Sequence, residues 1–328
     1  MGSQSHFPHV PAAGVWCPAI TFFDQSQDEI DFNAQNKYFS HLSRSGLTGI
    51  VAMGTNSEAF LLTREERYQL IANCRASVGP DFPIMAGVGA HSTKQTIELA
   101  QDAAKAGANY LLILPPAYFG KATSMAIVRS FFAKVAASVS LPVVIYNFPG
   151  VCNGVDIDSD TIVAIVKQSA AASSNGISNI VGVKLTCGSV GKITRLAAEL
   201  SASEFSTYGG QSDFLIGGLA AGSAGCIAAF ANVSPKLTSE IYRLYKEGKY
   251  AEATDLQQKA ALAERPCKAG IAATKYTVSQ STARLAGIED AEQKLLPRHP
   301  YEGPGEGVKE GARRAIAEVV GIETKLLQ

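Results

Sequence analysis

Residues 83–114 read PIMAGVGAHSTKQTIELAQDAAKAGANYLLIL, two short apolar runs that enclose one amphipathic segment. The two runs, Pro83–Val88 and Tyr110–Leu114, do not alternate strictly between apolar and polar residues, which is typical of strands covered on both faces. Between them, Ser92-Thr93-Lys94-Gln95 is a capping-box pattern that starts a helix, and Gly107 is a typical helix stop. This stretch therefore predicts one strand–helix–strand unit of a parallel sheet.

The same pattern recurs along the chain, with apolar runs that start 20 to 38 residues apart. Eight runs are found: Val15–Phe22, Gly49–Met53, Pro83–Val88, Tyr110–Leu114, Pro142–Tyr146, Ile180–Leu185, Phe205–Tyr208 and Gly225–Ala229. Eight strand–helix units favour a closed (β/α)8 barrel over an open, doubly wound sheet. The Gly-x-Gly-x-x-Gly turn that marks a dinucleotide-binding sheet does not follow the first run. The predicted fold class is α/β, a TIM barrel.

The end of the eighth unit sets the predicted domain organisation. Helix stops at Gly46, Gly107 and Gly248 punctuate the units, and the last of them closes the barrel pattern. We expect a catalytic barrel over residues 1–248 and a C-terminal helical extension, packed on the barrel, over residues 249–328. The extension is predicted to contain helices at Tyr250–Glu264, Pro266–Gly287 and Val308–Val320, with a Pro/Gly-rich stretch at 297–305.

Composition excludes several classes of partner. Lys plus Arg and Asp plus Glu both number 29 in the 328 residues, so there is no basic footprint for nucleic acid or an anionic membrane. The apolar runs are far shorter than the ~20 residues of a membrane span.

Six scattered cysteines, with no Cys-x-x-Cys pair or zinc spacing, indicate reduced thiols and no metal site. Because Met1–Ala13 has neither Lys nor Arg, nor an apolar core, we expect a cytoplasmic protein.

Reactive residues at the ends of the predicted strands are the first candidates for a site, because TIM barrels build their active sites there. Lys184 lies near the end of the run Ile180–Leu185, where burial would favour the neutral amine that attacks carbonyls to form a Schiff base. The alternative is a lysine that simply leaves the barrel for solvent. Tyr146 ends the fifth run and could shuttle protons, or could be a half-buried tyrosine bound to backbone.

Three loops after strands are further candidates. Gly54-Thr55-Asn56-Ser57-Glu58 could cradle a carboxylate with its backbone N–H groups, or could be an ordinary turn. Pro115–Phe119 is a stiff loop that presents aromatic residues, either as part of a site or as an oligomer contact. The glycines of Tyr208-Gly209-Gly210-Gln211 allow close approach of a ligand, and phosphate is one possibility.

Taken together, these residues resemble the N-acetylneuraminate lyase / dihydrodipicolinate synthase family of class I aldolases. The resemblance extends from Val15 to about Ile288, and its matching stretches are Gly54–Glu58, Tyr146-Asn147-Phe148-Pro149, Gly182-Val183-Lys184 and Gly225–Ala228 with Asn232-Val233. It implies that Lys184 forms a Schiff base with the keto carbon of pyruvate or another 2-keto acid. No cofactor or metal is then required, because the protonated imine is itself the electron sink.

The resemblance also implies roles for the other strand-end residues. Tyr146 relays protons, and Thr55 bridges Tyr146 toward Tyr118, which in this family reaches in from a neighbouring subunit. Thr55 and Asn56 hold the keto-acid carboxylate, while Gly210 and Ile227 line the pocket. A homodimer or homotetramer is therefore expected.

Departures from the family pattern narrow the expected substrate. Members that make dihydrodipicolinate usually carry an Arg where this chain has Val151, and an apolar side chain cannot pair with a second carboxylate. Asn56 and Ser57 replace a usual Thr and Gly, and Thr186 places a hydroxyl two residues after Lys184. Asn56 and Thr186 are similar to the 4-hydroxy-2-oxoglutarate aldolase branch, and Tyr146–Gly150 resembles 2-keto-3-deoxy sugar acid aldolases. We expect an aldolase of one of these types that releases pyruvate.

Three alternatives remain open from the sequence. The chain could be a dihydrodipicolinate synthase, which shares the Schiff-base residues and differs in its second substrate. It could be a barrel that binds a keto acid without catalysis, although such a protein has little reason to keep Lys184, Tyr146, Thr55 and Tyr118. It could use the Tyr208–Gln211 loop for phosphate or flavin, which would leave Lys184 and Tyr146 unexplained.

Overall fold

A computed structural model describes residues 7–327 of the chain, so part of the Met1–Ala13 stretch considered above lies outside the described residues. Eight parallel strands form a closed barrel in the order β1-β10-β9-β8-β7-β6-β5-β4. Their bounds are β1 Gly14–Pro18, β4 Gly49–Ala52, β5 Ile84–Gly87, β6 Tyr110–Ile113, β7 Val143–Asn147, β8 Ile180–Leu185, β9 Ser206–Gly209 and β10 Gly225–Ile227. The prediction of a (β/α)8 barrel is confirmed, and each predicted run overlaps one of these strands.

Helices separate the strands and continue after the last one. The helices between and after the barrel strands are α1 Phe32–Ser43, α2 Arg64–Val78, α3 Thr93–Lys105, α4 Met125–Ala136, α5 Ser159–Ala172, α6 Val190–Glu199, α7 Leu215–Ala220 and α8 Pro235–Lys246. The C-terminal helices are α9 Tyr250–Ala263, α10 Ile271–Ser279, α11 Thr282–Leu285, α12 Ala291–Lys294 and α13 Glu306–Leu326. A break between α8 and α9 falls at Gly248, where we placed the boundary of the extension; the division into two domains there stays a prediction.

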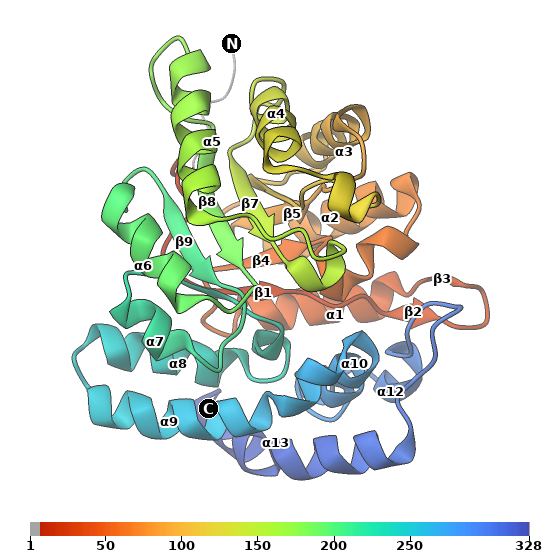
Figure 1. Ribbon diagram of the computed structural model, residues 1–328. Helices are drawn as coiled ribbons and strands as arrows, with labels where there is room; N and C mark the ends of the chain where they lie inside the picture. The colour runs from red at the N-terminus through yellow and green to blue at the C-terminus, as the bar shows by residue number, and fades with distance from the viewer. Residues whose placement is uncertain (1–6, 328) are drawn as a thin grey trace. The chain divides into compact units, whose positions relative to one another are not determined.

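The described residues divide into two compact units. The first contains residues 7–13, 83–210 and 217–226, with β5 to β9 and helices α3 to α6. Every residue of these five strands is buried, as expected when helices cover the outside of a barrel and side chains fill the inside. Helix α5 packs on β8 and α6 packs on β9, and Figure 1 shows both pairs in green.

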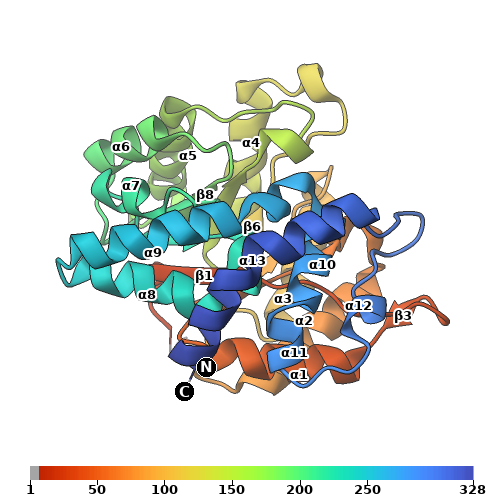
Figure 2. The same cartoon turned by 90° about the horizontal axis from the view of Figure 1, so that it is seen from below.

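The second unit contains residues 14–82, 211–216 and 227–327. Strand β1 pairs with β4 so that Trp16 lies opposite Gly49, and a Cβ on Gly49 would come within 2.3 Å of the indole ring. A glycine is therefore required there if the tryptophan is to stay buried. Helix α13 packs against α8, α9 and α10, and Figure 2 shows it crossing these helices.

Side-chain caps fix where several helices begin. Thr63 accepts a hydrogen bond from the Glu66 backbone N–H at 3.2 Å, and the Glu66 carboxylate accepts one from the Thr63 N–H at 2.7 Å. This completes the capping box at the start of α2. Ser92 accepts from the Gln95 N–H in the same way at the start of α3, as its sequence pattern predicts.

Two predicted elements differ from the structure. The single helix expected over Pro266–Gly287 is wrong: it is a 3-10 turn followed by α10 and α11. The break after the turn falls at Gly270, whose φ of +117° no helix can accommodate. The first predicted run, Val15–Phe22, is longer than its strand, because β1 ends at Pro18; after the run the chain forms a two-stranded hairpin of β2 (Phe23–Asp24) and β3 (Glu29–Ile30).

Among residues 7–327, no helix is long and apolar enough to cross a membrane. No group of three or more His, Cys, Asp or Glu side chains there could hold a metal ion. All six cysteines are free thiols, and burial raises the pKa of Cys152 to about 12, which makes this thiol, close to the predicted site, a poor nucleophile.

Candidate active site

The centre of the candidate site is a lysine beside a tyrosine on adjacent strands. Tyr146 of β7 and Lys184 of β8 are register partners in the parallel sheet, and each side chain is about 3% exposed. The Lys184 Nζ lies 4.2 Å from the centroid of the Tyr146 ring. Phe148 stacks on the same ring, with centroids 5.8 Å apart, and supports it from the following loop. The amine and the phenol are thus buried neighbours, which is the arrangement that proton exchange between them requires.

Asn147 connects three segments of the chain around this pair. Its side chain is fully buried, donates to the Asp156 carboxylate at 2.7 Å and accepts from the Ile157 N–H at 2.9 Å. Its backbone carbonyl accepts from the Thr186 N–H at 2.9 Å. The residue that follows Tyr146 therefore holds both the end of β8 and the loop that leads to α5.

A buried lysine completes this support. Lys192 of α6 donates to the Asp156 carboxylate and to the Ile157 carbonyl. From the sequence, Asn147 was predicted only as part of a motif, and Asp156 and Lys192 were not predicted. The one sequence signal for Lys192 is its place in the first turn after the Ser189 cap, where a cation is disfavoured unless it has a partner.

Thr186 and Gly210 lie against each other at the ends of β8 and β9. The Gly210 N–H donates to the Leu185 carbonyl at 3.0 Å, and a Cβ on Gly210 would lie 2.1 Å from the Thr186 Oγ1. That Oγ1 is buried and has no hydrogen-bond partner among the described residues. A buried hydroxyl without a partner is uncommon and calls for an explanation, and a bound substrate is one.

The turn predicted to bind a carboxylate belongs to the second unit. Thr55–Ser57 forms a 3-10 turn directly after β4 and Gly54. The Ser57 N–H donates to the Gly54 carbonyl and the Glu58 N–H donates to the Thr55 carbonyl, so these two groups are used inside the turn. The prediction of carboxylate binding therefore concerns Thr55 and Asn56.

Ser57 fits the position where the family pattern has a glycine. The left-handed angles of this segment fall on Met53 (φ +61°) and Glu58 (φ +56°), not on Ser57. The Ser57 hydroxyl is buried and donates to the Ala19 carbonyl at 2.6 Å, while its own carbonyl accepts from the Thr21 hydroxyl at 2.8 Å. The serine thus ties the turn to the segment after β1.

The remaining predicted residues occupy different environments. Ile227 is the last residue of β10 and is fully buried. Tyr118 is 71% exposed on the loop after β6, and its ring contacts those of His91 and Phe119 at centroid distances of 5.8 and 5.2 Å. Tyr118 is therefore placed on the surface, unlike Lys184 and Tyr146. Val151 is 45% exposed and presents an apolar side chain in the turn that follows β7.

Comparison with known proteins finds the family that the sequence resembles, and the match extends over nearly the whole chain. A sequence model of the dihydrodipicolinate synthetase family matches residues 11–301. A candidate mitochondrial 4-hydroxy-2-oxoglutarate aldolase from Coccidioides immitis is 62% identical, over 97% of this chain and 99% of that protein. A second candidate with the same name and compartment, from Emericella nidulans, is 37% identical over 97% and 98%. An L-threo-3-deoxy-hexylosonate aldolase from Hypocrea jecorina is 34% identical over 92% and 96%.

The fold has a close match among solved structures. A crystal structure of a candidate dihydrodipicolinate synthase family protein from Coccidioides immitis superposes with a TM-score of 0.91 at 59% identity. It covers 97% of this chain and 99% of the crystallised chain.

These comparisons also correct one expectation. A cytoplasmic location was predicted because residues 1–13 lack a recognisable address, but the relatives from Coccidioides immitis and Emericella nidulans are both named as mitochondrial. The prediction is therefore wrong. It depended on the absence of a pattern, and organellar addresses are read by receptors that tolerate wide variation in sequence.

Proposed function

The chain belongs to the dihydrodipicolinate synthetase family and is an aldolase, and we propose that it cleaves a 4-hydroxy-2-keto acid into pyruvate and an aldehyde through a Schiff base on Lys184. The observation that carries this proposal is the buried contact between the Lys184 amine and the Tyr146 ring, 4.2 Å from Nζ to centroid. The names of its relatives support two substrate types, 4-hydroxy-2-oxoglutarate and 3-deoxy-hexulosonic acids.

The chemistry follows from a lysine amine beside a phenol. The Lys184 amine attacks the keto carbon, and loss of water leaves an imine whose protonated form attracts electrons. Tyr146 gives its proton to the departing hydroxyl and then accepts the proton of the C4 hydroxyl; the C3–C4 bond breaks, the aldehyde leaves, and the electron pair moves into an enamine. Protonation of the enamine carbon and addition of water release pyruvate and restore the lysine.

Thr186 and Val151 support the choice of second substrate. The buried, unpartnered Thr186 hydroxyl lies two residues after Lys184 and could bind a polar group of the keto acid. Val151 cannot make the bidentate ion pair that recognises the carboxylate of aspartate semialdehyde. These two residues favour an aldolase over a dihydrodipicolinate synthase.

Tyr118 supports a shared site in an oligomer. Its side chain is 71% exposed in the single chain, yet the family role assigned to this position is a proton relay. We propose that Tyr118 enters the site of a neighbouring subunit in a homodimer or homotetramer. Sedimentation of the protein, with and without substitutions around Tyr118, would measure the assembly.

Borohydride reduction in the presence of pyruvate tests the covalent step. We expect one reduced pyruvate per chain, and peptide mass spectrometry should place it on Lys184. Lys184→Ala should take up none, whereas Lys167→Ala, a matched change in the same unit, should label like the wild type. An adduct on another lysine, or none on a folded wild-type protein, would contradict the proposal, and the second result would favour a barrel that only binds keto acids.

The choice of substrate is then measured by pyruvate release. 4-Hydroxy-2-oxoglutarate and 2-keto-3-deoxy sugar acids are each supplied, with lactate dehydrogenase reporting the pyruvate formed. We expect kcat/KM for one of these acids to be at least about 100-fold higher than kcat/KM for aspartate semialdehyde in its condensation with pyruvate. This ratio corresponds to a difference of ~3 kcal/mol in transition-state binding. A faster reaction with aspartate semialdehyde would instead identify a dihydrodipicolinate synthase.

We also propose the mitochondrial compartment of the relatives for this protein. Immunolabelling of the full-length native protein with an organelle marker tests it, and a diffuse cytosolic signal would contradict it.

A further inference from the structure

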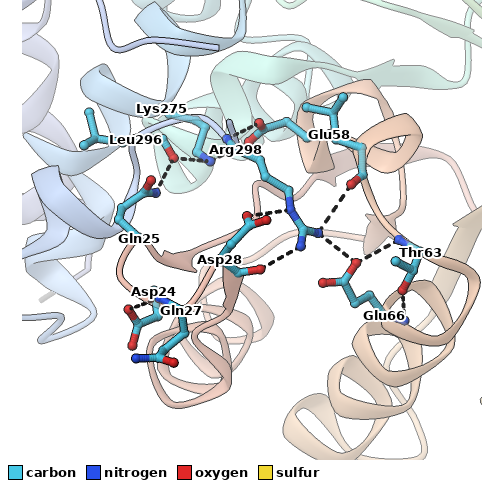
Figure 3. A network of polar contacts seen from close by, with 11 residues as sticks. Asp24, Gln25, Gln27, Asp28, Glu58, Thr63, Glu66, Lys275, Leu296 and Arg298 are labelled. Carbon is cyan, nitrogen blue, oxygen red and sulfur yellow. Dashed lines mark hydrogen bonds and ion pairs between the residues drawn. The ribbon is translucent and has the colours of Figure 1, made fainter. Parts of the chain in front are cut away.

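Four residues surround the end of the Gly54–Glu58 turn, and we call them the Glu58 cluster: Glu58, Lys275, Leu296 and Arg298. The Lys275 ammonium donates to the Glu58 carboxylate at 2.5 Å and to the Leu296 carbonyl at 3.1 Å. The second Glu58 oxygen accepts from the Arg298 backbone N–H at 2.9 Å. Figure 3 shows these contacts, which join α10 and the segment before α13 to a turn more than 200 residues earlier in the chain.

The ion pair at the centre of this cluster is almost completely withdrawn from water. The Lys275 side chain is 0% exposed and that of Glu58 is 2% exposed. The Lys275 ammonium also lies 4.5 Å from the centroid of the Phe23 ring. Removing both charges from water is energetically costly, and a well-packed apolar pair of the same volume is often as stable or more stable. Stability alone is therefore a poor reason for this pair.

Glu58 also carries conformational strain, because its backbone lies in the left-handed region. A φ of +56° is unusual for a residue that is not glycine, asparagine or aspartate, and such angles gather at functional sites. The carboxylate of Glu58 anchors this conformation from one side, and the Leu61 N–H, which donates to the Glu58 carbonyl at 2.8 Å, anchors it from the other.

Arg298 ties the same segment to the start of α2. Its guanidinium donates to the Glu66 carboxylate at 2.7 Å, to the Asp28 carboxylate at 2.9 Å and to the Leu61 carbonyl at 3.3 Å. Glu66 is the residue that completes the capping box of α2. The stretch 58–66 is consequently fixed at both ends by one C-terminal segment (Figure 3).

The charge of Glu58 matters because of what precedes it. Thr55 and Asn56, three and two residues earlier, are the residues proposed to hold the keto-acid carboxylate. A buried carboxylate so close behind an anion site would repel the substrate strongly, since water does not screen it there. Lys275, which follows Glu58 by 217 residues in the chain, pairs with the Glu58 carboxylate and supplies the compensating positive charge.

We infer that Lys275 and Arg298 are positioning residues for keto-acid binding, which neutralise Glu58 and hold the Gly54–Glu58 turn in the conformation that receives the substrate carboxylate. This inference rests on the proposed function. It gives the C-terminal segment 275–298 a part in substrate affinity, although none of its residues is required to touch the substrate. The alternative is a cluster that serves stability alone.

Borohydride trapping at increasing pyruvate concentration distinguishes a role of the Glu58 cluster in substrate binding from a role in stability alone. We expect Lys275→Met to raise the half-saturating pyruvate concentration at least tenfold, with the limiting trapping rate changed less than threefold. Removing both charges in Glu58→Gln/Lys275→Met should restore most of the affinity. Lys309→Met is the control, because it removes pairs with Glu292 and Glu306 from the C-terminal region but lies outside the Glu58 cluster.

Folding is followed by circular dichroism and thermal unfolding of every variant. If Lys275→Met does not fold, the isosteric Glu58→Gln replaces it, and its half-saturating concentration should rise less than threefold, because the amide has no negative charge to repel the substrate and its oxygen can still accept the hydrogen bond from Lys275. Equal half-saturation in wild type and Lys275→Met, an uncorrected defect in the double variant, or a tenfold rise in Glu58→Gln would each overturn the inference. A wild type that forms no adduct would overturn the proposed function as well.

Discussion

Glu323 offers a direct test of how the last helix is held in place. It lies on α13 with no exposed surface, and its two carboxylate oxygens accept from the Lys236 and Leu237 N–H groups, each at 2.8 Å. These are the first N–H groups of α8, whose N-cap residue Ser234 makes no side-chain cap. Glu323 thus caps a helix 86 residues earlier in the chain.

The magnitude follows from the pKa of this carboxyl. Burial raises the pKa of Glu323 from an ordinary value of 4.5 to about 7, although the two N–H groups act in the opposite direction. Such a difference between the folded and unfolded states corresponds to about 3 kcal/mol. Between these two pH values the folded protein retains a proton that the unfolded chain has lost. The contribution of Glu323 to the free energy of unfolding is therefore fully present below about pH 4.5 and is lost as the pH rises through about 7.

Glu323→Gln removes this titration while keeping the shape of the side chain. We expect the unfolding free energy of the variant, measured relative to the wild type, to rise by about 3 kcal/mol between about pH 5 and about pH 8. Urea unfolding at a series of pH values measures it, provided that the m-values of the two proteins agree. Glu318→Gln is the control, because Glu318 lies on the same helix with a side chain 65% exposed. Parallel pH profiles for wild type and Glu323→Gln would refute the reasoning.

Three further predictions concern the site. Tyr118→Phe should lower kcat about 100-fold while leaving pyruvate trapping intact, because only a proton relay is lost; unchanged turnover in steady-state kinetics would remove Tyr118 from the relay. Gly210→Ala should lower kcat/KM at least tenfold, because its Cβ would lie 2.1 Å from the Thr186 Oγ1; wild-type kinetics would show that the strands can separate at no cost. Burial lowers the pKa of Lys275 to about 8, so the half-saturating pyruvate concentration should rise as the pH passes that value and Glu58 loses its counter-charge. A trapping curve independent of pH, or the same rise in Glu58→Gln/Lys275→Met, would contradict this.

The sequence predicted the features that depend on local patterns. Eight apolar runs gave the barrel, because a strand buried on both faces must be apolar along its whole length, as β8 is. The capping box at Thr63 and Glu66 was predictable because both bonds lie within four residues. Lys184 and Tyr146 were predictable as neighbours once each was placed at a strand end, since the ends of parallel strands meet at one face.

Local patterns failed where a break depends on a single backbone angle. The helix expected over residues 266–287 is divided at Gly270 and again at Ser281, although its composition is compatible with a continuous helix. The predicted location failed for a different reason, because it was inferred from a missing signal and not from a residue that is present.

Only the tertiary structure decided which charges far apart in the chain are in contact. Lys275 and Glu58 are separated by 217 residues, and Lys192 and Asp156 by 36. In the sequence each of these looks like an ordinary surface residue, because charged side chains prefer water unless a partner is provided. The sequence by itself determined which residues can carry the chemistry and at which strand ends they lie. Folding decided which charges leave water together, because only the packed chain can place a lysine of α10 against the turn after β4.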